Sequence, residues 1–454
     1  MTGFRFSEVA DRLEARHLHD DAVFNSISTD TRTLEPGDLF VALTGPHFDG
    51  HDYLERAQEL GTPGFMVSRP HSLDMPTLMV ADTGIGLGRL AATWRLASHA
   101  PLIAVTGSNG KTTVKEMIAA ILSRRGSVLA TQGNLNNEIG VPLTLLRLQE
   151  EDFAVVEMGA NHPGEIGYLS KIAQPDVALL INAGRSHLEG FGSVEGVARA
   201  KAEILEGLQE TGCFVFNADD AWSSLWREMA GSRKVFTFGV DQPADVRSRP
   251  EAITISWDEQ GFTTRFPVET PSGELEVELT LAGRHNRMNA LAAIAATHQA
   301  GTDLEDMRTG LATLTPVKGR LQPVAGRNGV GLIDDSYNAN PDSVAAAIEV
   351  LSSAPGRRFL VLGELAELGQ GTQDFYRMLG EQAKRSGIDH LYATEVAGPA
   401  AESFGSGGAC FRTRDALIEN LDGLLQREDR VLIKGSRRAG MERVVEALAE
   451  GKGD

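Results

Sequence analysis

The sequence predicts an α/β protein of three domains: a small N-terminal α/β domain, a central doubly wound parallel sheet, and a C-terminal Rossmann-like α/β domain. Three observations support this fold class. The chain has 454 residues, and roughly 150 residues per domain gives about three domains. Short apolar segments alternate with helical patterns in the central and last blocks, which favours parallel sheets. The 49 glycines exceed the usual share of about 7 %, so many tight turns are expected.

The first block, residues 1–99, is predicted to contain short strands between Gly- and Pro-rich turns. Strand-like runs lie at 38–43, 64–67 and 77–80. The first 21 residues carry no apolar signal core and are predicted to form an amphipathic helix. These elements predict a small α/β domain.

The second block, residues 100–315, opens with an apolar run, LIAVTG, that is typical of a buried strand. A helix is predicted from about Lys111, because the apolar residues at 114, 117, 118, 121 and 122 fall on one face. Further strands are predicted at 153–157 and 177–182. Between 241 and 281 apolar and polar residues alternate, which predicts an antiparallel excursion.

The third block, residues 316–454, repeats the α/β pattern. The segments GVGLIDDS, FLVLGEL and RVLIKGS each read as a strand that ends in polar or Gly residues, with helices expected between them. Sheets of this kind bind ligands beyond the carboxyl ends of their strands. The polar strand ends are therefore candidate binding positions.

Composition excludes several classes of protein. Lys and Arg total 43 and Asp and Glu total 62, so the formal net charge is −19, which gives no global attraction for nucleic acid or anionic membrane. Two distant cysteines, Cys213 and Cys410, exclude a disulfide scaffold and a Cys-based zinc cluster. No apolar run reaches the ~18 to 20 residues that span a bilayer. We expect a soluble, cytoplasmic protein.

The segment GSNGKTT follows a predicted strand and opens a predicted helix. Such a turn exposes backbone N–H groups to phosphate oxygens, and the helix N-terminus adds a partial positive charge. Lys111 can reach the β- and γ-phosphates of ATP, and Thr112 can place a hydroxyl on Mg²⁺. The strict pattern has glycine at position 105, where this chain has Val105. We predict a P-loop, whose candidate ATP-binding residues are Gly107, Ser108, Asn109, Gly110, Lys111, Thr112 and Thr113.

Three further residues have both a functional and a structural interpretation. Glu157 ends a predicted buried strand, where P-loop enzymes hold their metal, but a solvated strand-end carboxylate is as good an interpretation of that residue alone. His187 follows another strand, and a single histidine in a loop is more often structural than a ligand. Lys201 lies in a predicted helix, and composition favours a solvated surface lysine.

Two polar clusters complete the candidates. Asn286 and Asn289 are one turn apart at the start of a predicted helix, where they could hydrogen-bond a base or a carbonyl group. The structural alternative is a capped, polar helix start. The turn DDSYNANP follows a predicted strand of the third block. Its Asp could accept hydrogen bonds from ribose hydroxyls, and its Asn and Tyr could bind polar substrate groups. The structural alternative is a turn rich in Asx and Pro.

These motifs together resemble the Mur ligases, which are ATP-dependent amide-forming enzymes of peptidoglycan synthesis. TGSNGKTTVKEM, the strand-end Glu157, His187, Lys201 in AKAEI, GRHN and DDSYNANP occur in the order expected of that family, over essentially the whole chain. GNLNNEIGVPLTLLRL, VVEMGANHPGEIGYL, SHLEGFGSVEGVARAKAEI and DDSYNANP are most similar to the member that joins D-alanyl-D-alanine to UDP-N-acetylmuramoyl-tripeptide. These two compounds are the implied substrates.

The resemblance implies a role for each matching position. Lys111, Glu157, His187 and Lys201 would be catalytic; Thr112, Glu157, His187 and Lys201 would serve two Mg²⁺ ions, with Lys201 carbamylated by CO₂. Asn286 and Asn289 would approach the adenine of ATP, and Arg320 and Asp335 would bind from the linker and the third domain, with Asp335 on the ribose.

For the substrates, the resemblance implies three groups of residues. The UDP group would be held by Ser28, Thr29, Asp30 and Arg32, in the domain over residues 1–99. The muramoyl-peptide would lie along Asn134, Asn136 and Asn137, in the domain over 100–315. The candidates for D-alanyl-D-alanine are Asn338, Asn340, Lys434 and Ser436, in the domain over 316–454.

The implied chemistry starts with attack of the tripeptide carboxylate on the γ-phosphate of ATP, which yields an acyl phosphate and ADP. The amine of the dipeptide then displaces phosphate. Closure of the last domain is expected to exclude water from the acyl phosphate. We expect a monomer.

Three other classes of protein share part of this pattern. The diaminopimelate-adding sister ligase is expected to carry a DNPR-type signature, which is absent here. A folylpolyglutamate synthase has its phosphate loop near the start of the chain and lacks such an N-terminal domain. A P-loop ATPase acting as a conformational switch needs a partner-binding surface, whereas this chain has a substrate-sized first domain and an Asn-rich middle segment.

Overall fold

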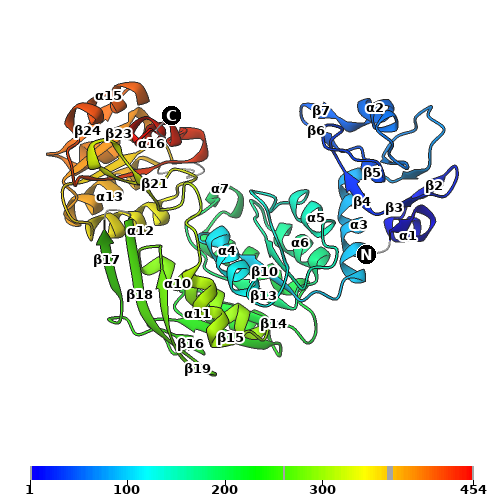
Figure 1. Ribbon diagram of the computed structural model, residues 1–454, viewed down its shortest axis with the longest axis horizontal. Helices are drawn as coiled ribbons and strands as arrows, with labels where there is room; N and C mark the ends of the chain where they lie inside the picture. Colours follow the sequence, from blue (N-terminus) through cyan, green and yellow to red (C-terminus); the bar gives the residue numbers. More distant parts are fainter. Residues whose placement is uncertain (1–2, 259–260, 366–371, 452–454) are drawn as a thin grey trace.

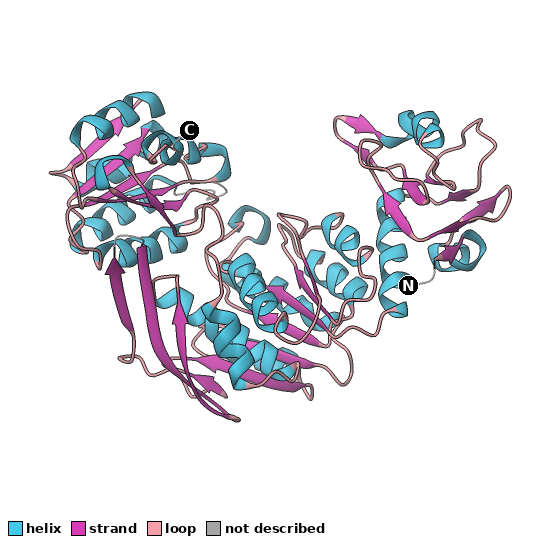
Figure 2. Cartoon of the chain, in the orientation of Figure 1, coloured by secondary structure: helices cyan, strands magenta, loops and turns pink. Residues whose placement is uncertain are grey.

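Three α/β domains follow one another along the chain and form an arc, with the N-terminal domain at one end and the C-terminal domain at the other (Figure 1). The computed structural model describes residues 3–258, 261–365 and 372–451. Each domain combines helices with a sheet (Figure 2). Within the described ranges, no helix is both long enough and apolar enough to cross a membrane. The predicted fold class is confirmed.

The N-terminal domain is built on a five-stranded sheet in the order β2-β9-β8-β5-β4, parallel except where β2 meets β9. One face packs on α1 and the other on α2. The elements are β1 (Phe4–Arg5), α1 (Phe6–Leu13), β2 (Arg16–Leu18), β3 (Val23–Phe24), β4 (Ser26–Ser28), β5 (Asp38–Val41), β6 (Thr44–Gly45), β7 (Phe48–Asp49), α2 (Leu54–Glu59), β8 (Phe65–Val67) and β9 (Thr77–Met79). The three predicted strands are present, each shorter than predicted by one or two residues.

The predicted N-terminal amphipathic helix is shorter than the pattern suggested. Helix α1 buries Phe6, Val9 and Leu13 on one face and ends at Glu14, which is left-handed at φ 52°. The chain then pairs as strand β2 with β9. Residues 16–18, which the sequence predicts to continue the helix, therefore form an edge strand of the sheet.

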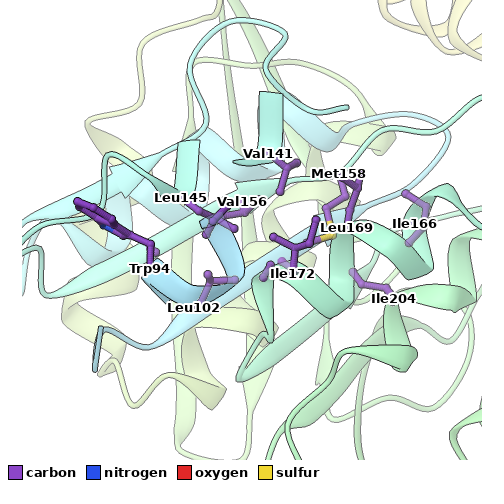
Figure 3. Close-up of a cluster of buried hydrophobic side chains, with 14 of the residues drawn as sticks. Trp94, Leu102, Val141, Leu145, Val156, Met158, Ile166, Leu169, Ile172 and Ile204 are labelled. Atoms are coloured by element: carbon purple, nitrogen blue, oxygen red, sulfur yellow. The ribbon is translucent and has the colours of Figure 1, made fainter. Parts of the chain in front are cut away.

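Helix α3 (Thr83–Ala97) joins the first two domains. Its residues share one hydrophobic cluster with α1 on one side and with the central domain on the other. Figure 3 shows Trp94 of α3 at the edge of this cluster, which also contains Leu102, Leu145 and Ile172 of the central domain. Trp94 also donates from Nε1 to the carbonyl oxygen of Leu148 at 2.7 Å. The N-terminal domain is therefore connected to the central domain by a packed helix rather than by a loose linker.

The central domain has a ten-stranded sheet in the order β11-β12-β10-β13-β14-β15-β16-β18-β17, with β19 paired to β18. Strands β10 to β16 are parallel to one another. The parallel strands are β10 (Leu102–Thr106), β11 (Val128–Ala130), β12 (Phe153–Glu157), β13 (Val177–Leu180), β14 (Cys213–Asn217), β15 (Lys234–Gly239) and β16 (Val246–Arg247).

Helices cover both faces of this parallel part, so the predicted doubly wound sheet is confirmed. One face carries α4 (Lys111–Leu122), α10 (Arg284–Gln299) and α11 (Leu304–Ala312). The other carries α3, α5 (Gly140–Leu145), α6 (Glu165–Ala173), α8 (Val194–Ala202) and α9 (Ser223–Ala230). The short helix α7 (Leu188–Phe191) lies between β13 and α8 in the chain.

The antiparallel excursion is also confirmed, and it continues the central sheet. Strands β17 (Thr254–Asp258), β18 (Gly261–Thr270) and β19 (Gly273–Leu279) are antiparallel, and β18 joins β16. At their far end Trp257 meets Phe262 edge-to-face, with ring centroids 5.1 Å apart. Both side chains pack into a hydrophobic cluster of the third domain, so these strands support that domain, as Figure 1 shows.

The C-terminal domain has a six-stranded sheet in the order β20-β21-β25-β22-β23-β24, parallel except at the edge strand β20. Its strands are β20 (Gln322–Ala325), β21 (Gly331–Asp335), β22 (Arg358–Leu362), β23 (His390–Thr394), β24 (Gly408–Phe411) and β25 (Arg430–Lys434). Helices α12 (Pro341–Ser352), α13 (Thr372–Arg385) and α14 (Gly398–Phe404) cover one face; α15 (Arg414–Leu424) and α16 (Glu442–Leu448) cover the other.

Candidate active site

A cavity of about 720 Å³ lies where the central and C-terminal domains meet. It collects the phosphate loop, the ends of β12 and β13, the start of α10, the linker around Arg320 and the turn after β21. The sequence candidates that line it are Ser108, Asn109, Gly110, Lys111, Thr112, Thr113, Asn136, Asn137, Glu157, His187, Asn286, Asn289, Arg320, Asp335, Asn338, Asn340 and Lys434. Residues that are far apart in the sequence thus share one site.

The phosphate loop has the predicted strand–turn–helix setting. Strand β10 ends at Thr106, and α4 begins at Lys111 after Gly110, which is left-handed at φ 85°. A Cβ on Gly110 would lie 2.4 Å from Oδ1 of Asn289, so this position requires glycine for space as well as for conformation. Val105, which departs from the strict pattern, is a buried residue of β10 that pairs with Glu157, so its side chain serves the core.

Lys111 is half-buried beside the loop that it follows. Its Nζ donates to the carbonyl oxygen of Gly107 at 2.8 Å, which folds the side chain back over the turn. Desolvation lowers the pKa of Lys111; the nearby Arg320 lowers it further, and Glu157 opposes both. An anionic ligand in the loop would favour the charged amine by the same electrostatic argument.

Thr112 and Glu157 form the centre of a hydrogen-bond network. The Thr112 hydroxyl donates to Oε2 of Glu157 at 2.9 Å, and Asn136 donates from Nδ2 to Oε1 at 2.8 Å. Nη2 of Arg320 donates to the Thr112 oxygen at 3.0 Å. Glu157 is only 2 % exposed, so the interpretation of a solvated strand-end carboxylate is wrong.

The donor set suits magnesium. No cluster of three or more His, Cys, Asp or Glu residues that could hold a metal occurs within the described ranges. Magnesium, however, is usually held by one or two carboxylates together with water and substrate phosphates rather than by an all-protein cage. The hydroxyl of Thr112 and the carboxylate of Glu157, adjacent to a phosphate loop, fit that requirement.

His187 and Lys201 differ in their relation to the cavity. His187 lines it, at a left-handed residue (φ 51°) that precedes α7. Lys201, in α8, is 1 % exposed and is absent from the cavity wall, with its Nζ 5.5 Å from the centre of the Phe191 ring. The expectation of a solvated surface lysine is therefore wrong. Burial, with a smaller effect of Lys111, lowers the pKa of Lys201 to about 7.

Asn286 and Asn289 are both buried and contact each other, as their spacing predicts. Nδ2 of Asn289 donates to Oδ1 of Asn286 at 3.0 Å, and Nδ2 of Asn286 donates to the carbonyl oxygen of Ala282 at 2.8 Å. The sequence motifs did not single out His285, whose Nε2 lies 3.2 Å from Nδ2 of Asn286. Burial lowers the pKa of His285 to about 4.

On the third-domain side, Lys434 and Asp335 pair with each other across the parallel strands β25 and β21. Their Nζ and Oδ2 atoms are 2.6 Å apart, and Nζ also donates to the carbonyl oxygen of Asn338 at 3.1 Å. Burial raises the pKa of Asp335, and Lys434 opposes the rise. Lys434, a candidate for the dipeptide carboxylate, thus already has an anionic partner, and Asp335, the ribose candidate, a cationic one.

The other candidates lie outside the cavity wall. These are Gly107, Lys201, Asn134, Ser436, Ser28, Thr29, Asp30 and Arg32. In the N-terminal domain, Arg32 forms an exposed ion pair with Asp30, with Nη2 and Oδ2 2.6 Å apart. Ser436 is buried and its Oγ has no hydrogen-bond partner among the described residues.

Sequence reasoning missed residues that hold the loops of the site together. Asn182, which follows β13, accepts through Oδ1 from the backbone N–H of Asn109 at 2.9 Å and donates through Nδ2 to the carbonyl oxygen of Asn109 at 3.1 Å. Tyr337, noted only as part of a turn, stacks under Arg320, whose guanidinium carbon is 4.4 Å from the ring centre. In the sequence, only the position of Asn182 at the end of a predicted strand indicated that it could belong to the site.

The fold and the site define a nucleotide-using P-loop protein of three α/β domains. Comparisons with known proteins agree. The Mur ligase middle domain matches residues 105–297, the Mur ligase glutamate ligase domain matches 319–437, and the Mur ligase family catalytic domain matches 23–121. The chain belongs to the Mur ligase family.

Individual relatives are similar over nearly their full lengths. The UDP-N-acetylmuramoyl-tripeptide–D-alanyl-D-alanine ligase of Escherichia coli is 45 % identical over 453 residues, 99 % of each chain. A crystal structure of MurF from Acinetobacter baumannii is 36 % identical, with a TM-score of 0.90 and 98 % of each chain covered. MurF ligase from Thermotoga maritima in complex with ADP is 31 % identical, with a TM-score of 0.83, covering 93 % of this chain and 96 % of that one.

Proposed function

We propose that this chain uses ATP to ligate D-alanyl-D-alanine to UDP-N-acetylmuramoyl-tripeptide, through an acyl phosphate, in the synthesis of peptidoglycan precursors. The single observation that carries the proposal is the cavity that joins a phosphate loop, the Thr112–Glu157 pair and the strand ends of the third domain. The relatives named above for this activity match the whole chain, including each of those parts.

In the first step the tripeptide carboxylate attacks the γ-phosphorus of ATP, and ADP leaves. Such phosphoryl transfer depends mainly on positioning and on neutralising charge. Lys111 and the N-terminus of α4 would face the phosphates. Arg320, which donates a hydrogen bond to Thr112, places a second cation at the same end of the loop. These groups stabilise charge that develops on the transferred phosphoryl oxygens.

Magnesium and a modified lysine belong to the same proposal. Thr112, Glu157 and His187, which line the cavity, would hold two Mg²⁺ ions together with a carbamylated Lys201. The ions would supply charge neutralisation at the attacking and leaving oxygens. Carbamylation requires a neutral amine, and a buried lysine with a pKa of about 7 is neutral in a substantial fraction at physiological pH. The carbamate would convert this buried amine into an anion, the charge that a cation prefers.

In the second step the amine of D-alanyl-D-alanine attacks the acyl carbon and expels inorganic phosphate. We propose that the acceptor binds on the third-domain side of the cavity, near Asn338, Asn340 and Lys434, and that the buried Ser436, two residues after Lys434, belongs to the same region. Amide side chains can both donate to and accept from the peptide bond of a dipeptide. The cavity walls from two domains would shield the acyl phosphate from water.

The three domains would divide the substrates between them. Residues 1–99 would bind the UDP group near Ser28, Thr29, Asp30 and Arg32; residues 100–315 would bind ATP and, along Asn134, Asn136 and Asn137, the muramoyl-peptide; residues 316–454 would bind the amine. Adenine would lie near Asn286 and Asn289, and ribose near Asp335. We further propose a cytoplasmic monomer, which fits an enzyme that consumes ATP and a nucleotide-activated precursor.

A coupled assay of ADP release tests this function. UDP-muramoyl-peptides and amines would be supplied singly and in pairs, and we expect full rates only with the tripeptide and D-alanyl-D-alanine together. Free D-alanine, L-lysine or diaminopimelate should support far lower rates, since each would leave buried polar groups unpaired. A preference for diaminopimelate with the dipeptide precursor would instead identify the sister ligase. L-Glutamate with a folate would identify a folylpolyglutamate synthase, and ADP release without an amine and a carboxylate would identify a switch ATPase.

A further inference from the structure

Two contacts from the third domain reach the nucleotide side of the cavity directly. The first involves Asn340, which precedes α12. Its Nδ2 donates to Oδ1 of Asn109 at 2.7 Å, although the two residues are 231 positions apart. Asn109 belongs to the phosphate loop, so a residue of the third domain is hydrogen-bonded to the loop that faces the phosphates of ATP.

The second contact involves Asp342, in the first turn of α12. Its Oδ2 accepts from the backbone N–H of Arg185 at 2.7 Å, and its Oδ1 lies 3.5 Å from Nε of the same arginine. A Cβ on Gly184 would lie 2.7 Å from Oδ2 of Asp342, so glycine at that position allows the carboxylate to approach. The Arg185 guanidinium also lies over the Phe375 ring of α13, 5.8 Å from its centre.

Both contacts end on one unit of the central domain. Asn182 is hydrogen-bonded to the backbone of Asn109 in both directions, and Oγ of Ser108 accepts from the N–H of Gly184 at 2.9 Å. The loop over 182–187, which ends at His187, is therefore fastened to the phosphate loop. A shift of either contact with α12 would move both loops together.

We propose that the pairs Asn340–Asn109 and Asp342–Arg185 form an interdomain clasp, and that Asn340 and Asp342 are positioning residues for phosphoryl transfer. The inference rests on the proposed function and adds to it a link between domain position and catalysis. With the clasp engaged, the phosphate loop and the loop carrying His187 are held in one geometry. With the third domain displaced, both lose a partner, while the backbone N–H groups that bind phosphate remain.

The clasp therefore affects turnover more than nucleotide affinity. The phosphates of the nucleotide would be held by the phosphate loop and α4, which belong wholly to the central domain, and the clasp variants leave Asp335, the ribose candidate, unchanged. Transfer of the phosphoryl group requires alignment within a fraction of an ångström, and loss of a positioning contact can cost orders of magnitude in rate. This difference between kcat and affinity separates a positioning role from a merely structural one.

Asn340→Ser is the sharpest single variant. Oδ1 of Asn340 also caps α12 by accepting from the N–H of Ser343 at 2.9 Å, and serine caps helices as well as asparagine does. The shorter side chain keeps the cap but cannot reach Asn109. Asp342→Ala removes the second contact, and Glu349→Gln, an exposed position on the same helix, is the matched control.

We expect kcat for ADP release to fall about tenfold in Asn340→Ser and in Asp342→Ala. Each variant loses one polar contact between the domains, and about tenfold is the typical effect of one such contact. The Kd for ADP should stay within about twofold, and Glu349→Gln should match the unmodified protein. Arg185→Ala should lower kcat less than Asp342→Ala does, because it removes only the side-chain contact at 3.5 Å and keeps the backbone N–H that donates to Asp342. Full kcat in both Asn340→Ser and Asp342→Ala would overturn the clasp.

A distance measurement supplies the second readout. Cys410 is an exposed thiol of the third domain and Cys213 is buried, so a dye on Cys410 and another on an introduced cysteine at the exposed Arg233 would report the interdomain distance. Single-molecule energy transfer, recorded with ATP and tripeptide, should show one dominant population in the Arg233→Cys background. Adding Asn340→Ser or Asp342→Ala should populate a second one; an unchanged distribution would overturn the proposal. If the unmodified protein fails to release ADP in response to both substrates, the proposed function fails instead.

Discussion

The two sides of the cavity differ in how far their side chains are arranged before any ligand is present. On the nucleotide side, Thr112, Glu157, Asn136 and Arg320 hold one another in a continuous network. On the substrate side, the candidates are engaged elsewhere: Lys434 with Asp335, and Arg32, in the N-terminal domain, with Asp30. Phosphate recognition is thus built mainly into the central domain, with Arg320 reaching it from the linker, whereas recognition of the UDP-muramoyl-tripeptide and of the dipeptide depends on all three domains.

This difference has an energetic meaning. A preorganised network does not have to reorganise when charge develops in the transition state, so its members should be costly to remove. Side chains that must first leave an ion pair contribute less to binding, because the cost of breaking that pair offsets the new contact. Substitutions on the nucleotide side should therefore cause large losses of activity, and substitutions on the substrate side small ones.

The largest effect is expected for Lys111→Ala. Removing a cation that faces the transferred phosphoryl group should lower kcat about a thousandfold while the fold is retained. Circular dichroism would monitor the fold and ADP release the rate. Lys234→Ala, an exposed lysine on β15, is the control and should keep full activity. Unchanged turnover of the Lys111 variant would remove the phosphate-loop assignment.

Lys201→Ala should lower kcat about a hundredfold, a typical cost for disturbing a metal site. If the native residue is a carbamate, a small carboxylic acid added to the variant should restore part of the rate by replacing the lost anion. Arg199→Ala, on the exposed side of the same helix, serves as the comparison and should remain active. A fully active Lys201 variant, together with an unmodified amine in a high-resolution map, would contradict the proposed modification.

The nucleotide side should also be sensitive to acid through His285. The pKa of this histidine is lowered to about 4, so the unfolded chain binds a proton below pH 6.5 that the folded chain does not. Stability therefore falls as the pH drops, by about 2 kcal/mol between pH 7 and 5 from this residue. Denaturant titrations at the two pH values should show that loss reduced in His285→Gln. The loss should be unaltered in His47→Gln, an exposed control. Equal pH dependence in all three proteins would be inconsistent with a buried neutral imidazole.

The smallest effect is expected at the far end of the molecule. Arg32→Ala should raise KM for the UDP-muramoyl-tripeptide about tenfold and leave kcat within twofold, because the residue would bind a part of the substrate remote from the chemistry. Arg56→Ala, an exposed arginine of the same domain, should change neither parameter. A fall in kcat without a change in KM would place Arg32 outside the UDP site.

The nucleotide side could be predicted from the sequence because its signals are local. The phosphate-loop motif occupies seven consecutive residues that follow a strand and open a helix, and Glu157 ends the neighbouring strand β12. Parallel strands bring their carboxyl ends to one edge, so the order of strands and motifs already implies that these residues meet. The doubly wound sheet and its antiparallel extension followed from the same reasoning.

Other features could not be predicted because they depend on contacts between distant segments. Burial of Lys201 arises from the packing of α8 against α6 and α9, which the helix pattern alone does not reveal. The pairing of Lys434 with Asp335 requires β25 to lie beside β21, although 99 residues separate them. The contact of Asn340 with Asn109 depends on how the third domain sits against the second.

The most direct test of the account follows an oxygen atom. The tripeptide substrate would carry ¹⁸O in its reacting carboxylate, and the inorganic phosphate formed with ATP and D-alanyl-D-alanine would be analysed by mass spectrometry. Ligation through an acyl phosphate predicts one ¹⁸O in each phosphate released, because the bridging oxygen leaves with phosphorus when the amine attacks. Phosphate without the label would mean that water attacked ATP directly, and it would contradict the proposed ligase mechanism.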